Sequence, residues 1–138
     1  MTMQQEVKKG KARLKRKGVK GLRIIGSGVF RRCYALSRHL VAKTSTDSEH
    51  QREELELSRR FPKSVAWVYG IVNGILIQER ASKLLCDTVE PDDDYSSPII
   101  DGLEIETAMR DLHDENVGYI PRKGWRIIDA GMGSRRRR

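Results

Sequence analysis

The sequence predicts an α+β fold made of antiparallel strand pairs, and two observations carry this prediction. In VAWVYGIVNGILIQERA, Asn73 and Gly74 separate two apolar runs, which is typical of a β-hairpin. In STDSEHQREELELSRRF, Leu57 and Phe61 recur at helical spacing. By length, the 138 residues form one domain that can bury a core.

The first half of the chain is interpreted as an arm, short strands and a helix. Residues 1–20 are expected to be mobile or marginally helical. Thr46, followed three residues later by Glu49, fits a capping box, and the helix it opens runs for about three turns to Pro62. The first strand of the hairpin is expected to end at Val72, and the second to run from Ile75 to Glu79. Other strands are expected at residues 22–25, 33–36 and 40–43.

The second half begins with a polar stretch. Residues 82–97 contain Asp92-Asp93-Asp94 and predict a surface linker. A short helix is expected at about residues 98–109, although Gly102 is unfavourable in it. A polar loop then leads into GWRIIDAG, which predicts a strand that ends at a turn. No internal repeat is visible.

The net charge of +8 is concentrated at the two ends of the chain. Residues 8–23 hold nine basic residues and no acid, and Arg135 to Arg138 are all arginine. Residues 87–115 hold eleven acids and one base, Arg110. Basic ends suit nucleic acid or an acidic partner. A solvated tail, or an arm folded over the acidic stretch, is the alternative.

The sequence points away from membranes and from secretion. No apolar run approaches the roughly 20 residues that span a bilayer, and the basic N-terminus lacks the apolar core of a secretory signal. Cys33 and Cys86 lie far apart without metal-ligand spacing. We interpret them as reduced thiols of a cytoplasmic protein.

Three features suggest phosphate chemistry. Gly26-Ser27-Gly28 follows a strand, and glycines let backbone N–H groups approach phosphates closely. Lys43 lies on an apolar strand and needs a partner, which the Glu-rich helix can supply. Oxygen ligands for Mg²⁺ are available from Asp111, Asn116 and Asp129. Each feature alone could be an ordinary turn, cap or solvent-reaching lysine.

In this order, however, these motifs resemble those of the protein-kinase-like fold. MRDLHDEN is similar to the catalytic loop H-R-D-L-x-x-x-N, DAG to D-F-G, VAK to V-A-I-K, and GSGVFR to the start of G-x-G-x-x-G. ILIQERA resembles the fifth strand running into the hinge that lines the adenine site. The steps of five residues from Asp111 to Asn116 and thirteen to Asp129 match the family's spacing. Asp111-Leu112-His113 stands where many kinases have Asp-Leu-Lys. This feature and the compact sequence resemble small bacterial or phage kinase-like proteins.

The resemblance implies a fold and a division of the chain. An antiparallel N-lobe sheet with one C-helix would be followed by a truncated C-lobe that holds one helix, the catalytic loop and the metal-binding turn. The expected segments are a basic flexible arm at 1–20, an N-lobe-like part at 21–81, an acidic linker at 82–97, a truncated C-lobe-like part at 98–131 and a basic tail at 132–138.

The resemblance also implies ATP and Mg²⁺ as cofactors and a role for each matching residue. Lys43 would contact the phosphates and pair with Glu54, with Glu53 as the alternative. Asp111 would accept the substrate proton. Asn116 and Asp129 would hold Mg²⁺. The residues expected to cover the phosphates or line the adenine site are Gly26, Ser27, Gly28, Glu79 and Ala81.

The chain also departs from the family pattern. Met109 replaces His, Arg31 stands at the third Gly position, Cys33 at the Val over adenine, and Ala130 at the Phe of D-F-G. Only seven residues follow Gly131, without room for an activation loop or the large C-lobe helices.

Three functions follow as hypotheses. The first is a small phosphotransferase that acts on a protein or a small molecule, and that gains support for its short C-lobe from a partner or a dimer. The second is a catalytically silent kinase-like protein that binds and blocks a macromolecule. The third is a nucleic-acid binder that uses Lys8–Arg23 and Arg135–Arg138.

Overall fold

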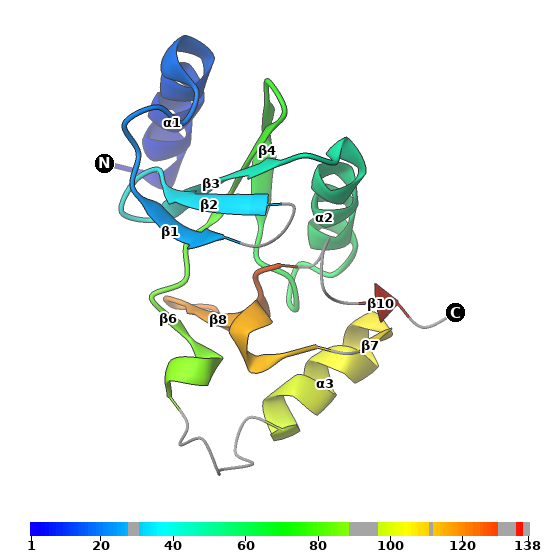
Figure 1. Cartoon of the computed structure of the whole chain (residues 1–138). Coiled ribbons are helices and arrows are strands. Elements are labelled where there is room, and N and C mark those ends of the chain that lie inside the picture. Colours follow the sequence, from blue (N-terminus) through cyan, green and yellow to red (C-terminus); the bar gives the residue numbers. More distant parts are fainter. Residues whose placement is uncertain (28–30, 89–96, 111, 130–134, 137–138) are drawn as a thin grey trace. The chain divides into compact units, whose positions relative to one another are not determined.

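The computed structural model describes residues 1–27, 31–88, 97–110, 112–129 and 135–136 (Figure 1). These residues form two compact units. Unit 1 comprises Met1–Leu55 and Trp67–Arg80, and unit 2 comprises Glu56–Ala66 and Ala81–Arg138. Each unit gathers around its own cluster of buried apolar side chains. None of the helices in these ranges is both long and apolar enough to span a bilayer.

Unit 1 is built on a five-stranded sheet in which every neighbouring pair is antiparallel. The strand order is β1-β2-β3-β5-β4. The α+β class and its antiparallel pairing are therefore confirmed. The bounds of the strands are β1 Ile24–Ser27, β2 Arg31–Ala35, β3 Leu40–Ser45, β4 Val68–Val72 and β5 Ile75–Glu79.

The β4–β5 hairpin has the connection that the sequence predicted. Val72 pairs with Ile75, so Asn73 and Gly74 form a two-residue loop. Their φ angles of 51° and 80° are both positive, as a type I′ turn requires. Asn and Gly tolerate this conformation better than other residues, so the local sequence determines this turn.

Helix α1 (Met3–Lys17) lies in residues 1–20, the segment expected to be mobile or marginally helical. It begins with a capping box between Thr2 and Gln5 and packs against β3, β4 and β5 (Figure 1). Its buried positions are Glu6, Gly10 and Leu14, which recur every four residues and form one face. Tertiary contacts along that face stabilise a helix whose charges alone favour a solvated arm.

Helix α2 (Ser48–Arg60) begins slightly later than the sequence suggested. The capping side chain belongs to Asp47, whose Oδ1 accepts the Glu49 backbone N–H at 2.9 Å. The expected cap, Thr46, is therefore wrong by one residue. Residues 48–55 of α2 belong to unit 1, whereas the rest of the helix belongs to unit 2.

Within the described residues, unit 2 contains one complete helix, the C-terminal part of α2, two short 3-10 turns and two small sheets. One sheet has the order β6-β8-β9, and in the other β7 pairs with β10. The core of the unit includes Leu57, Met109 and Ile127, which are almost fully buried. The element bounds are β6 Lys83–Leu84, η1 Leu85–Asp87, α3 Ser97–Thr107, β7 Met109–Arg110, η2 Asp114–Asn116, β8 Val117–Ile120, β9 Gly124–Ile127 and β10 Arg135–Arg136.

Unit 2 differs from the expectation at three places. The linker expected at 82–97 contains β6 and η1, while residues 89–96 lie outside the described ranges. Helix α3 ends at Thr107 rather than Met109, because Ala108 has a φ of 59° that cannot continue a helix. The loop before GWRIIDAG includes β8, which pairs with β9. The sequence did not predict β8, because polar residues flank this short strand and its pairing with β9 stabilises it.

Candidate functional site

Lys43 lies in β3, in the middle strand of the unit 1 sheet. It pairs with Cys33 of β2 on one side and Leu76 of β5 on the other. The residue is only 6% exposed. A buried ammonium group requires hydrogen-bond and charge partners, because an unpaired charge in the interior is strongly unfavourable.

Glu54 of α2 supplies that partner. The Lys43 Nζ lies 3.2 Å from one carboxylate oxygen of Glu54 and 3.3 Å from the other. The Glu54 side chain is fully buried, and that of Lys43 is 8% exposed. The structure thus pairs Lys43 with Glu54, whereas the adjacent Glu53 lies half-buried on another side of the helix.

Arg31 shares the same carboxylate, a contact that the sequence did not suggest. Its Nη2 lies 2.5 Å from Glu54 Oε1 and donates to Gln51 Oε1 at 2.7 Å. Arg31 begins β2, and its side chain is 5% exposed. This residue stands at the third Gly position of the kinase pattern, and in the structure its side chain contacts α2.

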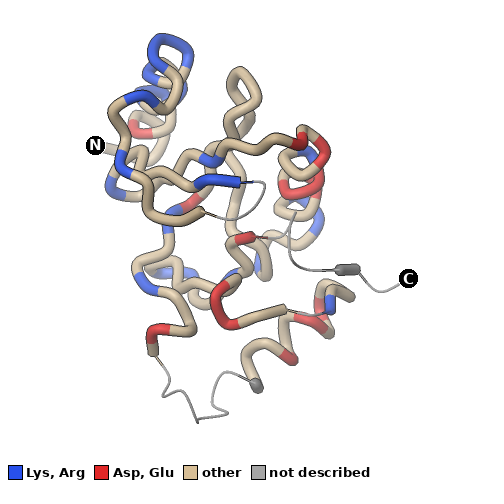
Figure 2. The backbone as a smooth tube through the Cα atoms, viewed as in Figure 1, with Lys and Arg blue, Asp and Glu red and all other residues tan. Residues whose placement is uncertain are grey.

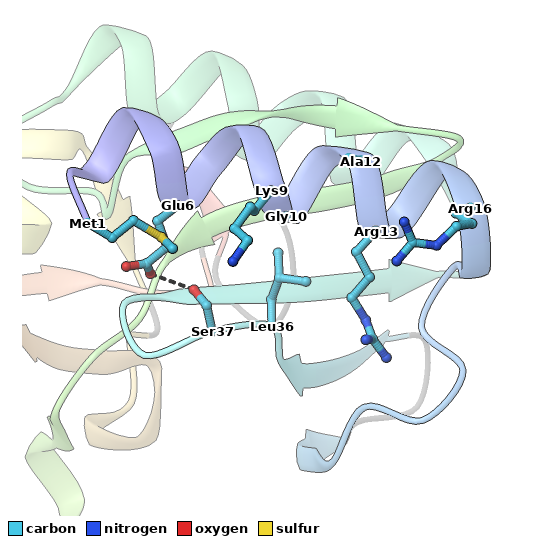
Figure 3. A pocket seen from close by; sticks show the side chains of 9 residues that line it. All are labelled: Met1, Glu6, Lys9, Gly10, Ala12, Arg13, Arg16, Leu36 and Ser37. Atoms are coloured by element: carbon cyan, nitrogen blue, oxygen red, sulfur yellow. Dashed lines mark hydrogen bonds between the residues drawn. The ribbon is translucent and has the colours of Figure 1, made fainter.

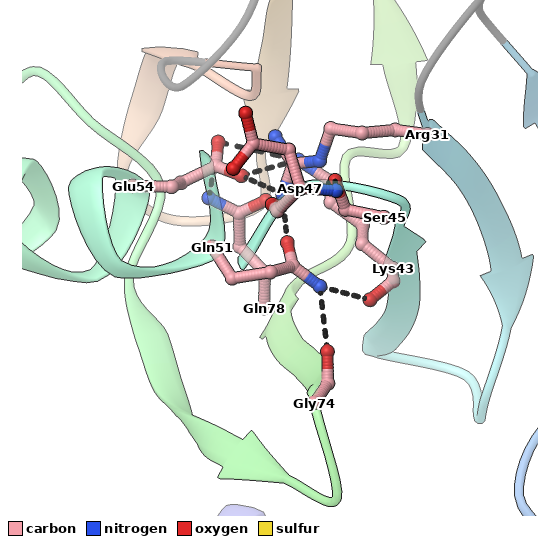
Figure 4. Close-up of polar contacts among 8 residues, drawn as sticks. All are labelled: Arg31, Lys43, Ser45, Asp47, Gln51, Glu54, Gly74 and Gln78. Carbon is pink, nitrogen blue, oxygen red and sulfur yellow. Dashed lines mark hydrogen bonds and ion pairs between the residues drawn. The ribbon is translucent and has the colours of Figure 1, made fainter. Parts of the chain in front are cut away.

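Two glutamines complete the cluster (Figure 4). The Gln51 side chain donates to the backbone carbonyls of Lys43 at 2.7 Å and Gly74 at 2.9 Å, which ties α2 to β3 and to the hairpin turn. Gln78 of β5 makes a long hydrogen bond of 3.5 Å to Glu54. Gln51 precedes Glu54 by three residues, so helical periodicity could have placed both side chains on one face.

The Gly26-Ser27-Gly28 segment is described only in part. Gly26 and Ser27 lie in β1, opposite Cys33 and Arg32 of β2, and Gly28 lies outside the described residues. A Cβ placed at Gly26 would lie 3.8 Å from the Cys33 Cβ, which is an ordinary contact distance. The packing of the described residues therefore does not itself require glycine at position 26.

Asn116 and Asp129 belong to unit 2, where a backbone hydrogen bond links Asn116 to the residue before Asp129. The Ile128 N–H donates to the Asn116 carbonyl at 2.8 Å, and Asp129 follows Ile128 directly. The Asn116 side-chain oxygen also accepts the His113 N–H at 3.3 Å. The residue is 9% exposed, so its orientation is constrained. Asp111, the expected proton acceptor, lies outside the described residues.

The expected hinge residues end one unit and begin the other. Glu79 is the last residue of β5 and is 6% exposed. Its carboxylate accepts the Trp67 N–H at 2.8 Å, which gives the side chain a structural role in unit 1. Ala81 begins the second segment of unit 2 and is half-buried.

The oxygen donors of unit 2 fit a hard divalent cation in kind. A carboxylate from Asp129 and an amide oxygen from Asn116 are groups that Mg²⁺ accepts in partial protein coordination completed by water and phosphate. Among the described residues, no group of three or more His, Cys, Asp and Glu could hold a metal ion.

The sequence matches no protein-family model and no curated protein. The function of the chain therefore has to be inferred from the chemistry of its own residues.

Proposed function

We propose that the chain is an ATP- and Mg²⁺-dependent phosphotransferase with a kinase-like fold. The observation that carries the proposal is the buried ion pair of Lys43 on β3 with Glu54 on α2. In protein kinases, a lysine on the third strand pairs with a glutamate on the following helix and holds the ATP phosphates. Here β3 is the central strand of the sheet, and α2 follows it directly in the sequence.

Lys43 would supply positive charge to the α- and β-phosphates. Glu54 and Gln51 fix the lysine from two sides, since one accepts from its ammonium and the other donates to its backbone carbonyl. This fixed position matters because phosphoryl transfer depends mainly on positioning and charge neutralisation.

The N–H groups of Gly26-Ser27-Gly28 would cover the phosphates. Because packing against Cys33 leaves ordinary room for a Cβ at position 26, close approach by a ligand is a better reason for glycine there than steric demand within the chain. A Gly26→Ala variant should therefore fold normally but bind ATP more weakly.

In the proposed reaction, an acceptor hydroxyl attacks the γ-phosphorus. The oxygen–phosphorus bond forms while the bond from the γ-phosphorus to the bridging oxygen breaks, and ADP leaves with that electron pair. Asp111 would accept the hydroxyl proton. Asn116 and Asp129 would hold Mg²⁺, which would neutralise phosphate charge when bound. The Ile128–Asn116 hydrogen bond supports this assignment, because it keeps the two ligand-bearing segments together.

The test follows the γ-phosphate of ATP onto the protein itself, a generic acceptor and water. Lys43→Met, Asp111→Ala and Asp129→Ala should each lower transfer by about 100-fold or more. Lys43→Met should remain folded, because Arg31 still contacts Glu54. Lys63→Met and Asp101→Ala replace exposed residues of the same types and should leave transfer unchanged.

Two results would overturn the proposal. One is folded wild-type protein that binds no ATP in the presence of Mg²⁺. The other is transfer that survives all three site substitutions, which would indicate a contaminating kinase.

Arg31 favours a second candidate, a catalytically silent protein of the same fold that binds a macromolecule. Its guanidinium lies closer to Glu54 than the Lys43 ammonium does, at 2.5 Å against 3.2 Å. The carboxylate could thus keep a structural partner even if Lys43 had lost its nucleotide role. A partner complex that is unaffected by Asp111→Ala and by removal of ATP would favour this candidate.

The proposal leaves the acceptor as either a protein or a small molecule with a hydroxyl group. It also implies a cytoplasmic location, where ATP is available. The proposal is compatible with a dimer or a complex with a partner protein, which would stabilise the folded chain by mass action. Light scattering at several protein concentrations would detect such a dimer.

A further inference from the structure

Helix α1 has two faces of opposite character. Glu6, Gly10 and Leu14 are buried against the sheet. The opposite face is cationic, and the only acid of the helix, Glu6, lies on the buried side. The exposed cations of the helix are Lys8, Lys9, Lys15, Arg16 and Lys17.

The buried face seats the helix firmly on unit 1. The Glu6 carboxylate accepts the Ser37 hydroxyl at 2.5 Å and both the backbone N–H and the ring Nδ1 of His39 at 2.9 Å. Gly10 allows a close approach, because a Cβ there would lie 2.9 Å from a terminal methyl of Leu36. The exposed cations are therefore carried by a fixed helix and not by a loose tail.

The exposed cations form rows along the helix. Lys8 and Lys15 are seven residues apart, as are Lys9 and Arg16, so each pair lies on one side of the helix at a separation of about 10 Å. Ala12 is exposed between the rows and presents only a methyl group. Beyond the helix, Lys20 and Arg23 are exposed as well, and Figure 2 shows Lys and Arg positions along α1 and the segment that follows it.

A pocket of about 380 Å³ lies at the edge of this face (Figure 3). Three of its lining residues are Lys9, Arg13 and Arg16, which extend from the helix on the side of Leu36 and Ser37. Glu6 also lines the pocket, but its carboxylate already accepts hydrogen bonds from Ser37 and His39. The Arg13 Nη2 already donates to the Lys20 carbonyl at 2.9 Å, whereas the exposed Lys9 and Arg16 can donate to an anion the size of a phosphate group.

We propose that the exposed face of α1, together with this pocket, binds the phosphate backbone of a nucleic acid. Lysine and arginine rows attract phosphates and release condensed counterions, which supplies sequence-independent affinity. The exposed part of the helix carries no aromatic side chain that could stack on bases. Binding is therefore independent of base sequence and falls steeply with salt.

The structure favours nucleic acid over a membrane surface. A helix that lies in a membrane interface inserts its apolar face among the lipids. In α1 that face carries Leu14, which is 1% exposed and packs in the core of unit 1. The helix cannot insert this face without leaving the sheet. An acidic protein segment presents fewer and less regular charges than a phosphate backbone.

The experiment measures binding of a short fluorescent DNA duplex and a short single-stranded RNA by anisotropy over a range of salt concentrations. The test variant changes four exposed cations of the helix to Gln, a good helix former. The control variant changes four exposed cations outside the helix to Gln, so that the net charge falls equally. The test set is Lys8, Lys9, Lys15 and Arg16, and the control set is Arg52, Lys63, Arg122 and Lys123.

We expect wild-type affinity to fall linearly with the logarithm of the salt concentration, and the test variant to lose about one unit of slope for each phosphate contact removed. The control variant should bind within about three-fold of wild type. Circular dichroism and thermal unfolding should show both variants folded. If only the test variant unfolds, the single variants Lys8→Gln and Lys15→Gln are measured instead. Each should lower the slope of affinity against salt concentration.

Three outcomes would overturn the proposal. Equal losses in the test and control variants would show that only net charge matters. Binding to vesicles of anionic lipid without binding to either nucleic acid would identify a membrane surface. Tighter binding to poly-glutamate than to DNA or RNA would identify an acidic protein as the partner. None of these results depends on whether the chain transfers phosphate.

Discussion

Two helices of unit 1 are each fixed to the sheet by one buried glutamate, but the partners of the two carboxylates differ. Glu6 of α1 accepts from a serine hydroxyl, a backbone N–H and the His39 ring. Glu54 of α2 accepts from the cations of Lys43 and Arg31. The first arrangement is shown in part in Figure 3 and the second in Figure 4.

The difference separates anchoring from positioning. The Glu6 carboxylate accepts hydrogen bonds from Ser37 and His39, and these bonds hold α1 in place without positioning a lysine or arginine side chain. A carboxylate shared by two buried cations fixes the orientation of those cations as well. Glu54 therefore controls where the Lys43 ammonium lies, whereas Glu6 controls only where α1 lies.

The largest effect is expected from Glu54→Ala. Its loss leaves the ammonium of Lys43 and the guanidinium of Arg31 buried without this carboxylate, and breaking a buried pair costs about 3–5 kcal/mol. Urea unfolding measures the change. Glu53→Ala, at the neighbouring half-buried position, should cost about 0.5 kcal/mol or less. Equal losses at positions 53 and 54 would contradict the assignment of Glu54.

Removing one cation at a time should have a smaller effect on stability but should separate the two cations by function. Lys43→Met and Arg31→Met each leave Glu54 with the other cation, so each should cost about 1–3 kcal/mol. ATP binding, measured by calorimetry, should be lost in Lys43→Met and kept in Arg31→Met. The opposite pattern would make Arg31 the phosphate-binding cation and would revise the proposed site.

At the other helix, Glu6→Gln should cost less than Glu54→Ala and should alter the pH dependence of stability. Burial raises the pKa of Glu6, but the hydrogen bonds from Ser37 and His39 outweigh it, so the pKa lies below the ordinary glutamate value. A carboxylate with a lowered pKa stabilises the fold fully above the ordinary value of about 4.3 and loses that contribution as the pH falls through its own pKa.

Urea midpoints at neutral and acidic pH measure this effect. Wild type should lose more stability on acidification than Glu6→Gln does, because Gln does not titrate. At neutral pH the variant should be less stable by about 1–3 kcal/mol. An equal loss of stability on acidification in both proteins would contradict a lowered pKa for Glu6 in the folded protein.

The smallest effect is expected from Gly10→Ala in α1. Alanine gains about 1 kcal/mol of helix propensity, but its Cβ would lie 2.9 Å from Leu36 Cδ2, which must shift. The two effects should nearly cancel. Gly102→Ala in α3 is the matched control, because a Cβ there meets nothing within 4 Å and should stabilise by the full amount. If Gly10→Ala stabilises as much as Gly102→Ala, the approach of α1 to Leu36 is looser than the structure has it.

The sequence by itself determined the elements whose signals are local. Asn73-Gly74 predicts its own turn, because both residues tolerate positive φ. The helix before Pro62 follows from its apolar spacing and from the capping pattern of Thr46 and Glu49, with an error of one residue at the cap. Lys43 could be named as a candidate because it lies on an apolar strand, whereas Glu54 was preferred to Glu53 only through the resemblance to protein kinases.

The tertiary structure decided the features that depend on residues far apart in the chain. Glu6 meets His39 over thirty-three positions, and Arg31 meets Glu54 over twenty-three. Neither pairing has a local signal, because each arises only after a helix packs on the sheet. For the same reason, the eight basic residues of the first twenty predict a mobile or marginally helical arm, whereas the few buried positions of α1 pack it on a core.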